Sequence, residues 1–518
     1  MFSRLTGARG RLGGFSLLSS GNFLTAVLAY LRQAEIARVF GTNWKTDAFA
    51  VALVFPTLAQ QVISHAFGSS FLPIYSDVLH NKGRQAADRL ASRILCWMAV
   101  AGLATIALLF VAAGRLTSFA GPGLSRETLG LSTVMLRTML PMLVLVSATG
   151  ILSGLMSCQK RFGIVGAIGV VNIAASFAAV ILGHARYGIM ILPLSGLAGA
   201  AASFVTALTA ALRYGFVFTP LIDPRENDFG RLVRLSAPVL LGALLGFTGP
   251  IVDKILASFL SESSVTAMDY AARVRDMALA LLFLPVSALS DVGLSEKAAR
   301  KDMGAFGVEL SSLLNWTSFM MLPAAALLSV FATPLVSVLF MRGSFDADSA
   351  SLVGRTLGYY APWLAQFGFG AVISRGFYAL KNSRTPVLIG IWGTAANILL
   401  DVILVMPMGT GGIALASTLS STAKTVLLTW TFLRMRTGIS LRPVLGEHVR
   451  LVAATAAAVC TALVLMRLLP VQLDMDFLAR LGRLSVWIAA SLGAYVLAAG
   501  LLRSSTLSAL SARIMKRA

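Results

Sequence analysis

The stretch LRQAEIARVFGTNWKTDAFAVALVFPTLAQQVISHAFGSSFLPIY, residues 31–75, contains two apolar segments joined by a short polar turn at residues 41–45. Four ionisable side chains lie inside these segments or at their ends: Arg32, Glu35, Arg38 and Asp47. Ionisable groups are costly in the interior of a bilayer, so they usually face a wet cavity, a partner or a substrate. We therefore predict that this pair of helices forms the wall of a polar pathway across a membrane.

Composition indicates that the rest of the chain is also membrane-embedded. Of its 518 residues, 57% are hydrophobic and only 13% are charged, whereas a soluble domain carries about 25% charged residues. Apolar runs long enough to cross a bilayer recur along the whole chain. They predict an all-α polytopic protein with about fourteen transmembrane helices, centred near Val27, Leu58, Ala104, Leu145, Ile173, Val205, Leu245, Leu281, Leu322, Phe367, Ile391, Leu419, Val459 and Val496.

The basic residues predict how the chain is oriented. If the N-terminus lies inside, the inner loops hold most of them, at residues 82–93, 160–161, 225–234, 297–301, 381–384, 434–450 and 513–517. This positive-inside pattern predicts a multi-pass membrane protein with both termini cytoplasmic. The formal charge of +21 is spread over short loops and forms no soluble patch. We therefore expect contact with membrane lipids and not with nucleic acid.

Signatures of catalysis and of metal binding are missing from the sequence. It contains no P-loop, no HExxH and no GxSxG motif. The three cysteines, Cys96, Cys158 and Cys460, are far apart and form no CxxC pair, so neither a disulfide framework nor a zinc site is predicted. We expect a transporter and not an enzyme, with no catalytic residue, metal or cofactor. It would work as a monomer, driven by the membrane potential, an ion gradient or substrate supply.

An internal repeat is visible in the sequence. GLMSCQKRFGIVGAIGVVNIAAS, from Gly154, matches GFYALKNSRTPVLIGIWGTAANIL, from Gly376. Both copies predict the end of a helix, a short basic turn, and then a helix that carries an asparagine, Asn172 in one copy and Asn397 in the other. The matched turn and asparagine argue against chance likeness between apolar helices.

The two copies run in the same direction, some six spans apart. Parallel repeats of this length are typical of transporters in which two lobes surround a site near the middle of the membrane. We therefore predict two pseudo-symmetric six-helix lobes, residues 1–220 and 221–440, around a central cavity. Residues 441–518 would add two C-terminal helices and a basic tail.

Arginines and glutamines are the candidates for substrate binding in this cavity. Arg32 in the first lobe and Arg273 in the second are predicted to face it and to form a cationic site. Such a site suits a phosphate group, because a guanidinium fork binds two phosphate oxygens at once. The second helix carries a polar stripe of Gln60, Gln61, Ser64 and His65, which would either contact the substrate or bond between helices. For Arg275, near Arg273, pairing with a neighbouring carboxylate is the preferred interpretation.

Four other ionisable residues are candidates for gating or coupling: Glu35, Arg38, Asp47 and Asp253. Glu35 is three residues from both Arg32 and Arg38 and can pair with either; for Arg38 such local pairing is the preferred interpretation. Asp47 would sit in the first turn of a helix capped by Thr46, where the dipole favours a negative charge. Asp253 adjoins Lys254, with which it could form a local ion pair. Asp401 is a similar but lower-ranked candidate.

Several segments together resemble one family. LRQAEIARVFGTNWKTDAFAVALVFP, VDKILASFL, DYAARV, LFMRGSFDADSASLVGRTLGYYA and GFYALKNSRTPV are similar to segments of the MurJ/MviN family, the lipid II flippases of the multidrug/oligosaccharidyl-lipid/polysaccharide (MOP) exporter superfamily. The resemblance extends to about residue 440. It implies a flippase that moves an undecaprenyl-pyrophosphate-linked saccharide, first of all the peptidoglycan precursor lipid II, to the periplasmic leaflet by alternating access.

The resemblance also bears on the cavity. Arg32 and Arg273 match two arginines that family members keep there to meet the pyrophosphate, whereas Ala26, Gln60 and Gln61 stand where the family usually has arginines. The cavity is therefore expected to be less cationic than is usual in the family. A flippase for another polyprenyl-linked glycan, such as an exopolysaccharide or O-antigen unit, remains an alternative. So do a MATE-like small-molecule antiporter and a non-transporting scaffold.

Overall fold

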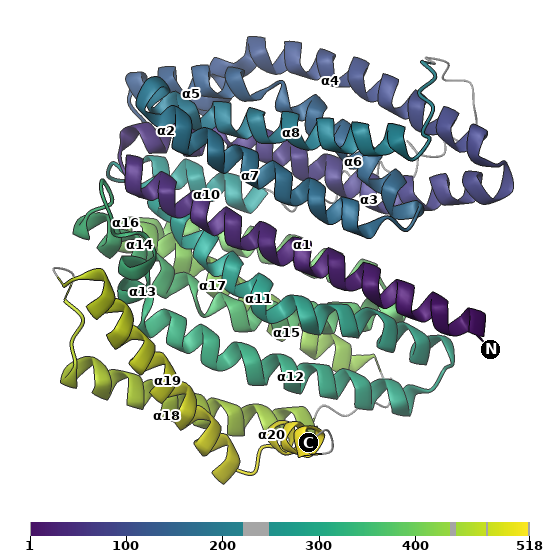
Figure 1. Cartoon of the computed structure of the whole chain (residues 1–518). Helices are drawn as coiled ribbons and strands as arrows, with labels where there is room; N and C mark the ends of the chain where they lie inside the picture. The colour runs from purple at the N-terminus through teal and green to yellow at the C-terminus, as the bar shows by residue number, and fades with distance from the viewer. Residues whose placement is uncertain (1, 221–247, 436–441, 473–474, 516–518) are drawn as a thin grey trace. The chain divides into compact units, whose positions relative to one another are not determined.

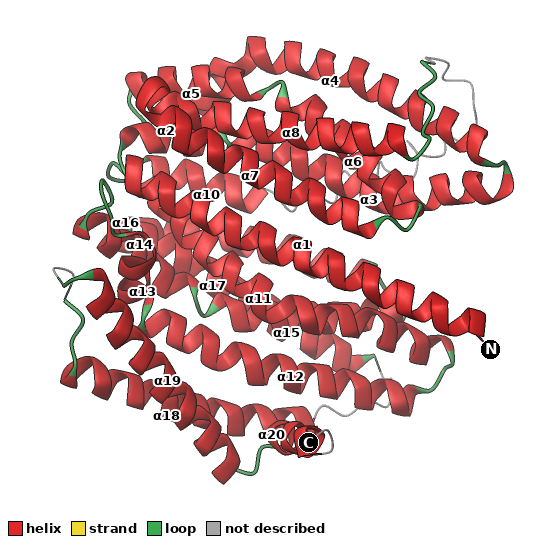
Figure 2. Cartoon of the chain, in the orientation of Figure 1, coloured by secondary structure: helices red, strands yellow, loops and turns green. Residues whose placement is uncertain are grey.

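The computed structural model describes residues 2–220, 248–435, 442–472 and 475–515. Side chains are described throughout these ranges except at residues 2–20, 62–70, 284–292, 442 and 512–515. Within the described residues every regular element is a helix (Figure 2). The expected all-α fold is confirmed.

Contacts divide the chain into two compact units, Met1–Ser263 and Ser264–Ala518. The helices of unit 1 are α1 Phe2–Phe40, α2 Trp44–Ala52, α3 Val54–Asn81, α4 Arg84–Ala120, α5 Arg126–Met139, α6 Met142–Cys158, α7 Phe162–Tyr187, η1 Gly188–Met190, α8 Ile191–Arg213 and α10 Thr248–Ser258. The helices of unit 2 are α11 Ser264–Ala299, α12 Met303–Val330, α13 Ala332–Phe340, α14 Ala347–Tyr360, α15 Trp363–Ala379, α16 Arg384–Met408, α17 Thr410–Arg434, α18 Arg442–Leu468, α19 Phe477–Leu501 and α20 Ser505–Met515.

The predicted spans coincide with these helices. Of the fourteen predicted centres, thirteen lie within helices, and the one near Leu245 lies outside the described residues. By length and composition, seven helical stretches of the described part can cross a membrane: Arg84–Ala120, Arg126–Cys158, Phe162–Arg213, Met303–Val330, Arg384–Met408, Pro443–Leu468 and Phe477–Leu501. The chain is a multi-pass helical membrane protein. The predicted lobe boundary after residue 220 borders residues outside the described part and stays a prediction.

Each unit is held together by small and apolar side chains between helices. In unit 1, α7 packs along α1 and α8, and α6 packs between α3, α4 and α8 (Figure 1). In unit 2, α17 packs on α15 and α16, while α18 packs on α12 and α19. Large apolar side chains on the outer faces are exposed, for example Val111 at 83% and Met406 at 87%. Such faces suit contact with hydrocarbon, where no water has to be excluded.

The internal repeat is present in the structure and has a constant spacing of 221 residues. Helix starts (126 and 347, 142 and 363) and the N-caps (125 and 346) keep this spacing. The basic turns keep it too: Lys160 and Lys381 both have a φ of 60°, and each follows the same pattern of backbone hydrogen bonds. This left-handed residue closes the preceding helix.

The spacing corrects one predicted correspondence. Asn172 is the eleventh residue of α7, whereas Asn397 is the fourteenth residue of α16. At 221 residues, Asn397 corresponds to Ser176, and Asn172 corresponds to Gly393. The two asparagines are 225 residues apart, four more than this spacing, so they lie about one helical turn out of register and do not occupy equivalent positions.

Candidate functional site

Arg32 lies in the C-terminal half of α1, where this helix packs on α7. Its Nη1 donates a hydrogen bond of 2.9 Å to the hydroxyl of Ser176 in α7, and the side chain is half-buried. Glu35 pairs with Arg38, through bonds of 2.5 and 2.8 Å from both ends of the guanidinium. The choice that the sequence left open for Glu35 is thus decided in favour of Arg38, and the preferred interpretation of Arg38 as a locally paired residue is confirmed.

Asp47 lies in the first turn of α2, as expected, but the cap of this helix differs from the prediction. Asn43 is the N-cap; its side chain accepts from the backbone N–H of Lys45 and of Thr46. Thr46 is the third residue of the helix and accepts from the N–H of Asn43, which completes a capping box. The prediction of Thr46 as the cap was wrong because the helix already begins at Trp44, so the residue before it, Asn43, is placed to accept from the first free N–H groups.

The Asp47 carboxylate reaches across to the segment that follows α10. Only 1% of Asp47 is exposed, and its Oδ2 accepts the backbone N–H of Ser263 at 2.7 Å. The backbone N–H of Trp44 donates to the carboxylate of Glu262 at 2.9 Å. Two segments more than 200 residues apart in sequence are therefore joined by a reciprocal pair of charge-assisted hydrogen bonds.

Two further contacts tie α10 itself to the same part of unit 1. The ammonium group of Lys254 donates to the carbonyl of Ala50 in α2 at 2.8 Å. The N–H of Gly123, in the turn between α4 and α5, donates to the hydroxyl of Ser258 at 3.0 Å. A Cβ at Gly123 would lie 2.3 Å from the carbonyl oxygen of Ser258, so the close approach requires glycine.

We call these four contacts the α10 clasp; they join Trp44, Asp47, Ala50 and Gly123 to Glu262, Ser263, Lys254 and Ser258, in that order. Ser263 has a φ of 74°, which residues other than glycine rarely adopt. The clasp therefore holds a strained residue in place, and strain of this kind is often found where a segment switches between two positions. Asp253 lies within α10, half-buried, directly before Lys254.

The glutamine candidates differ from the acidic ones because their side chains are exposed. The side chains of Gln60 and Gln61, on α3, make no hydrogen bond to other described residues. Neutral amides in this position can bond to hydroxyl or amide groups of a ligand, but they supply no charge to a phosphate. The next part of the predicted polar stripe, Ser64 and His65, lies outside the residues whose side chains are described.

In unit 2 the two arginines of α11 have different surroundings. Arg273 is exposed and makes no ion pair within the described part. Arg275 forms an ion pair of 2.8 Å with Asp276, and its guanidinium lies 4.8 and 4.4 Å from the ring centres of Tyr360 and Trp363. Local pairing of Arg275 is thus confirmed. Arg32 and Arg273 belong to different units, so a shared cavity between them stays a prediction.

Unit 2 also contains polar groups that sequence reasoning ranked low or missed. Asp401 in α16 is fully buried and accepts a 3.0 Å hydrogen bond from Asn397, one turn earlier. Lys424 in α17, whose stem packs on Gly393 of α16, was missed. It could have been found in the sequence as a lone lysine in an apolar run, because a lysine is as costly in a bilayer as an arginine.

An apolar cavity of about 360 Å³ was also missed, because helices far apart in sequence form it. It lies between α12, α15, α17 and α18 and is lined by Leu322, Phe369, Val426, Trp430 and Leu445, with His448 at its edge. His448 shares a 3.1 Å hydrogen bond with Ser318. A lining of this kind suits hydrocarbon and not an ion. Among the described residues no group of His, Cys, Asp and Glu could hold a metal ion.

Comparison with known families and sequences gives one consistent result. The model of the family described as "Lipid II flippase MurJ" matches residues 36–481. The lipid II flippase MurJ of Burkholderia cenocepacia is 28% identical over 434 residues, covering 80% of this chain and 81% of that protein. A probable lipid II flippase MurJ of Thermotoga maritima is 24% identical over 450 residues, covering 87% and 89%.

Solved structures show the same fold. A lipid II flippase MurJ in an inward closed conformation superposes with a TM-score of 0.78 at 21% identity, covering 94% of this chain and 98% of that one. An inward-facing MATE family multidrug resistance transporter of the MOP superfamily superposes with a TM-score of 0.70 at 13% identity, covering 79% and 94%. At these identities the likeness concerns the fold alone.

Proposed function

The chain belongs to the lipid II flippase MurJ family, and we propose that it moves lipid II, an undecaprenyl-pyrophosphate-linked saccharide, from the cytoplasmic to the periplasmic leaflet of the bacterial inner membrane. The observation that carries this proposal is the family match, which extends over residues 36–481 and so includes both copies of the internal repeat. The chain acts by alternating access, as a monomeric transporter with no catalytic step, and both termini lie in the cytoplasm.

Arg32 and Arg273 bind the pyrophosphate in this proposal. Arg32 is supported by its bond to the hydroxyl of Ser176, which orients the guanidinium. Arg273 is exposed and makes no ion pair within the described part of the chain. A charge-assisted bond to phosphate contributes about 1.5–3 kcal/mol, so loss of either arginine should weaken transport by a factor of about 10 or more.

The α10 clasp serves as a gate. Positive-inside topology puts its loops on the periplasmic side, and the strained Ser263 gains freedom when Asp47 releases it. Closing the clasp would seal that side while the opposite side admits substrate. Opening it exchanges charge-assisted hydrogen bonds for bonds to water, and such an exchange has a modest net free energy, as a reversible gate requires.

Energy input is proposed to come from the membrane potential or an ion gradient. Asp401 supports this. Its carboxylate is fully buried and accepts a hydrogen bond from the Asn397 amide, and such a group can bind or release a cation as its surroundings change. No cofactor is required by this scheme.

The test is complementation of a strain depleted of its own lipid II flippase. Periplasmic lipid II is measured with a membrane-impermeant reagent that reacts with its sugar or peptide. The intact chain should restore the signal, while Arg32→Ala and Arg273→Ala should lose it at equal membrane insertion. An Arg275→Ala variant, which removes a locally paired arginine of the same helix as Arg273, is the control and should retain most of it. Full activity of both Arg32→Ala and Arg273→Ala would exclude the proposed pyrophosphate site.

A second candidate substrate is favoured by the open, uncharged Gln60 and Gln61, which replace arginines expected from the family resemblance. A cavity with fewer cations and more amides would suit another polyprenyl-linked glycan. The same strain, supplied with a labelled exopolysaccharide or O-antigen carrier, distinguishes the two. Resistance to toxic cations on overexpression would instead favour a MATE-like antiporter.

A further inference from the structure

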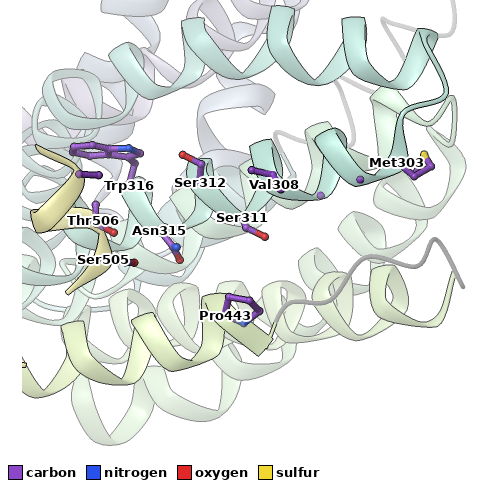
Figure 3. A pocket seen from close by; sticks show the side chains of 12 residues that line it. Met303, Val308, Ser311, Ser312, Asn315, Trp316, Pro443, Ser505 and Thr506 are labelled. Atoms are coloured by element: carbon purple, nitrogen blue, oxygen red, sulfur yellow. The ribbon is translucent and has the colours of Figure 1, made fainter. Parts of the chain in front are cut away.

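A second cavity in unit 2 lies away from all residues considered so far. Its volume is about 460 Å³, and three helices line it: the first half of α12, the start of α18, and the start of α20. Figure 3 shows side chains from these helices around one hollow, with Asn315 and Ser311 of α12 on one side and Pro443, Ser505 and Thr506 on the others. A volume of about 300–1,000 Å³ is typical of small-molecule sites.

One polar group of this cavity is left open for a ligand. The side-chain oxygen Oδ1 of Asn315 is buried and has no hydrogen-bond partner in the described part. The Oγ1 of Thr506 is also buried, and its hydroxyl lies beside the carboxylate of Glu447. Only 4% of Thr506 is exposed. Many serines and threonines of the described helices bond to a carbonyl of their own helix, as Thr455 does to Leu451. A buried polar group without a partner costs about 1–3 kcal/mol, so a ligand that bonds to the Asn315 oxygen would recover that cost.

The position of Thr506 is set by a buried carboxylate. Glu447 of α18, only 2% exposed, accepts the hydroxyl of Ser504 and the backbone N–H groups of Ser505 and Thr506. It therefore caps the N-terminus of α20 and pins it against α18. Arg450 lies 3.6 Å from the same carboxylate. The side chains of Ser505 and Thr506 are consequently held at the cavity before any ligand arrives.

The same arrangement restricts the charge of a ligand. Among the described residues that line the cavity, none is ionisable. The first N–H groups of α20, which in another setting would attract an anion, are already bonded to Glu447. Among these described lining residues, a phosphate would meet no cationic side chain and a cation would meet no carboxylate. The remaining groups are hydroxyls, an amide and the indole of Trp316, with apolar contacts from Met303, Val308 and Pro443.

We propose that this cavity binds an uncharged, hydroxyl-rich group of about one sugar unit, with its hydroxyls on Asn315, Thr506 and Ser311 and its C–H faces on Trp316 and Pro443. The source is the head of a neutral glycolipid in the adjoining leaflet. The cavity follows α12 from residue 303 to residue 316, about 20 Å at 1.5 Å per residue, and α12 is one of the stretches apolar enough to cross a membrane. A lipid head at the surface and a free sugar share this chemistry.

The experiment uses the full chain in nanodiscs and native mass spectrometry to count retained lipids. Glucosyl-diacylglycerol is compared with phosphatidylglycerol, phosphatidylethanolamine and diacylglycerol of the same chains. Methyl glucoside is added separately as a soluble probe. Asn315→Leu and Thr506→Val keep the shape of each side chain but remove its hydrogen-bonding groups. Thr455→Val, on the same unit but with its hydroxyl bonded within α18, is the control.

Glucosyl-diacylglycerol should be retained in preference to the other three lipids. Each variant at the cavity should weaken its retention by about three- to tenfold, the effect of one hydrogen bond, while Thr455→Val should not. Thermal unfolding without lipid should occur at an unchanged or slightly higher temperature for Asn315→Leu, because a buried oxygen with no partner in the described part is removed. If methyl glucoside displaces glucosyl-diacylglycerol, the ligand chemistry is supported and a free sugar is identified as a second source of the ligand.

Three results would overturn the proposal: equal retention by the cavity variants and the intact chain, equal retention of all four lipids, or ordered water alone in an experimental structure solved with glucosyl-diacylglycerol. None of these results depends on transport. The proposed flippase activity would stand if this site failed, and the reverse also holds.

Discussion

Replacing Asp47 with alanine should loosen the α10 clasp. The Asp47 carboxylate is 1% exposed and accepts the Ser263 N–H at 2.7 Å. A hydrogen bond to a charged group contributes about 1.5–3 kcal/mol. Its loss should therefore raise the population of the open clasp relative to the closed one by a factor of about 10–150. The strain at Ser263, with its φ of 74°, favours opening further once its partner is gone.

The opening can be followed at Ala257, a residue of α10 that is 1% exposed. An Ala257→Cys variant should react slowly with a membrane-impermeant maleimide while the clasp is closed. Addition of Asp47→Ala should raise the labelling rate at least tenfold, since the rate follows the open population when opening is fast.

The control is Glu127→Ala, which removes an exposed acidic residue from the first turn of α5. It should leave the labelling rate unchanged. If Asp47→Ala labels no faster than the parent, then the carboxylate does not hold α10, and the gate proposed here is wrong.

Three more predictions concern other contacts. Gly123→Ala places a Cβ 2.3 Å from the Ser258 carbonyl oxygen, so α10 must shift. Maleimide labelling of Ala257→Cys should rise, as in Asp47→Ala, and an unchanged rate would contradict the close contact between Gly123 and Ser258. Asp346→Ala removes the N-cap of α14, whose carboxylate accepts the Ser349 N–H at 2.8 Å; it should cost about 0.5–2 kcal/mol, measured by thermal unfolding. That bond also holds the pKa of Asp346 below its ordinary value, so its contribution to stability is present at neutral pH and lost as the pH falls below about 4. If the intact chain and the variant lose thermal stability equally between neutral and acid pH, this prediction is refuted. Asp401→Asn should abolish the dependence of transport on an imposed ion gradient in proteoliposomes, and an unchanged dependence would remove Asp401 from the coupling scheme.

Local pairings show where sequence reasoning loses resolution. Helical spacing puts Glu35 three residues from two arginines, and spacing alone is symmetric; only the rotamers in the structure select Arg38. In the same way, Asn43 and Thr46 are both capping residues, and only the backbone conformation identifies Asn43 as the cap. The asparagine correspondence failed because apolar helices tolerate a slip of one turn without changing their hydropathy.

The amino-acid sequence by itself determined the helical membrane fold, the positions of the spans, the repeat and the family. Each of these depends on hydropathy or on short motifs, which are local along the chain. Tertiary structure alone decided the α10 clasp, which joins Asp47 to Ser263, and the cavity between α12, α18 and α20. Both depend on which helices pack together, and in an apolar protein many helix faces are alike, so their pairing is specified by shape and by a few polar groups that only the folded chain brings into contact.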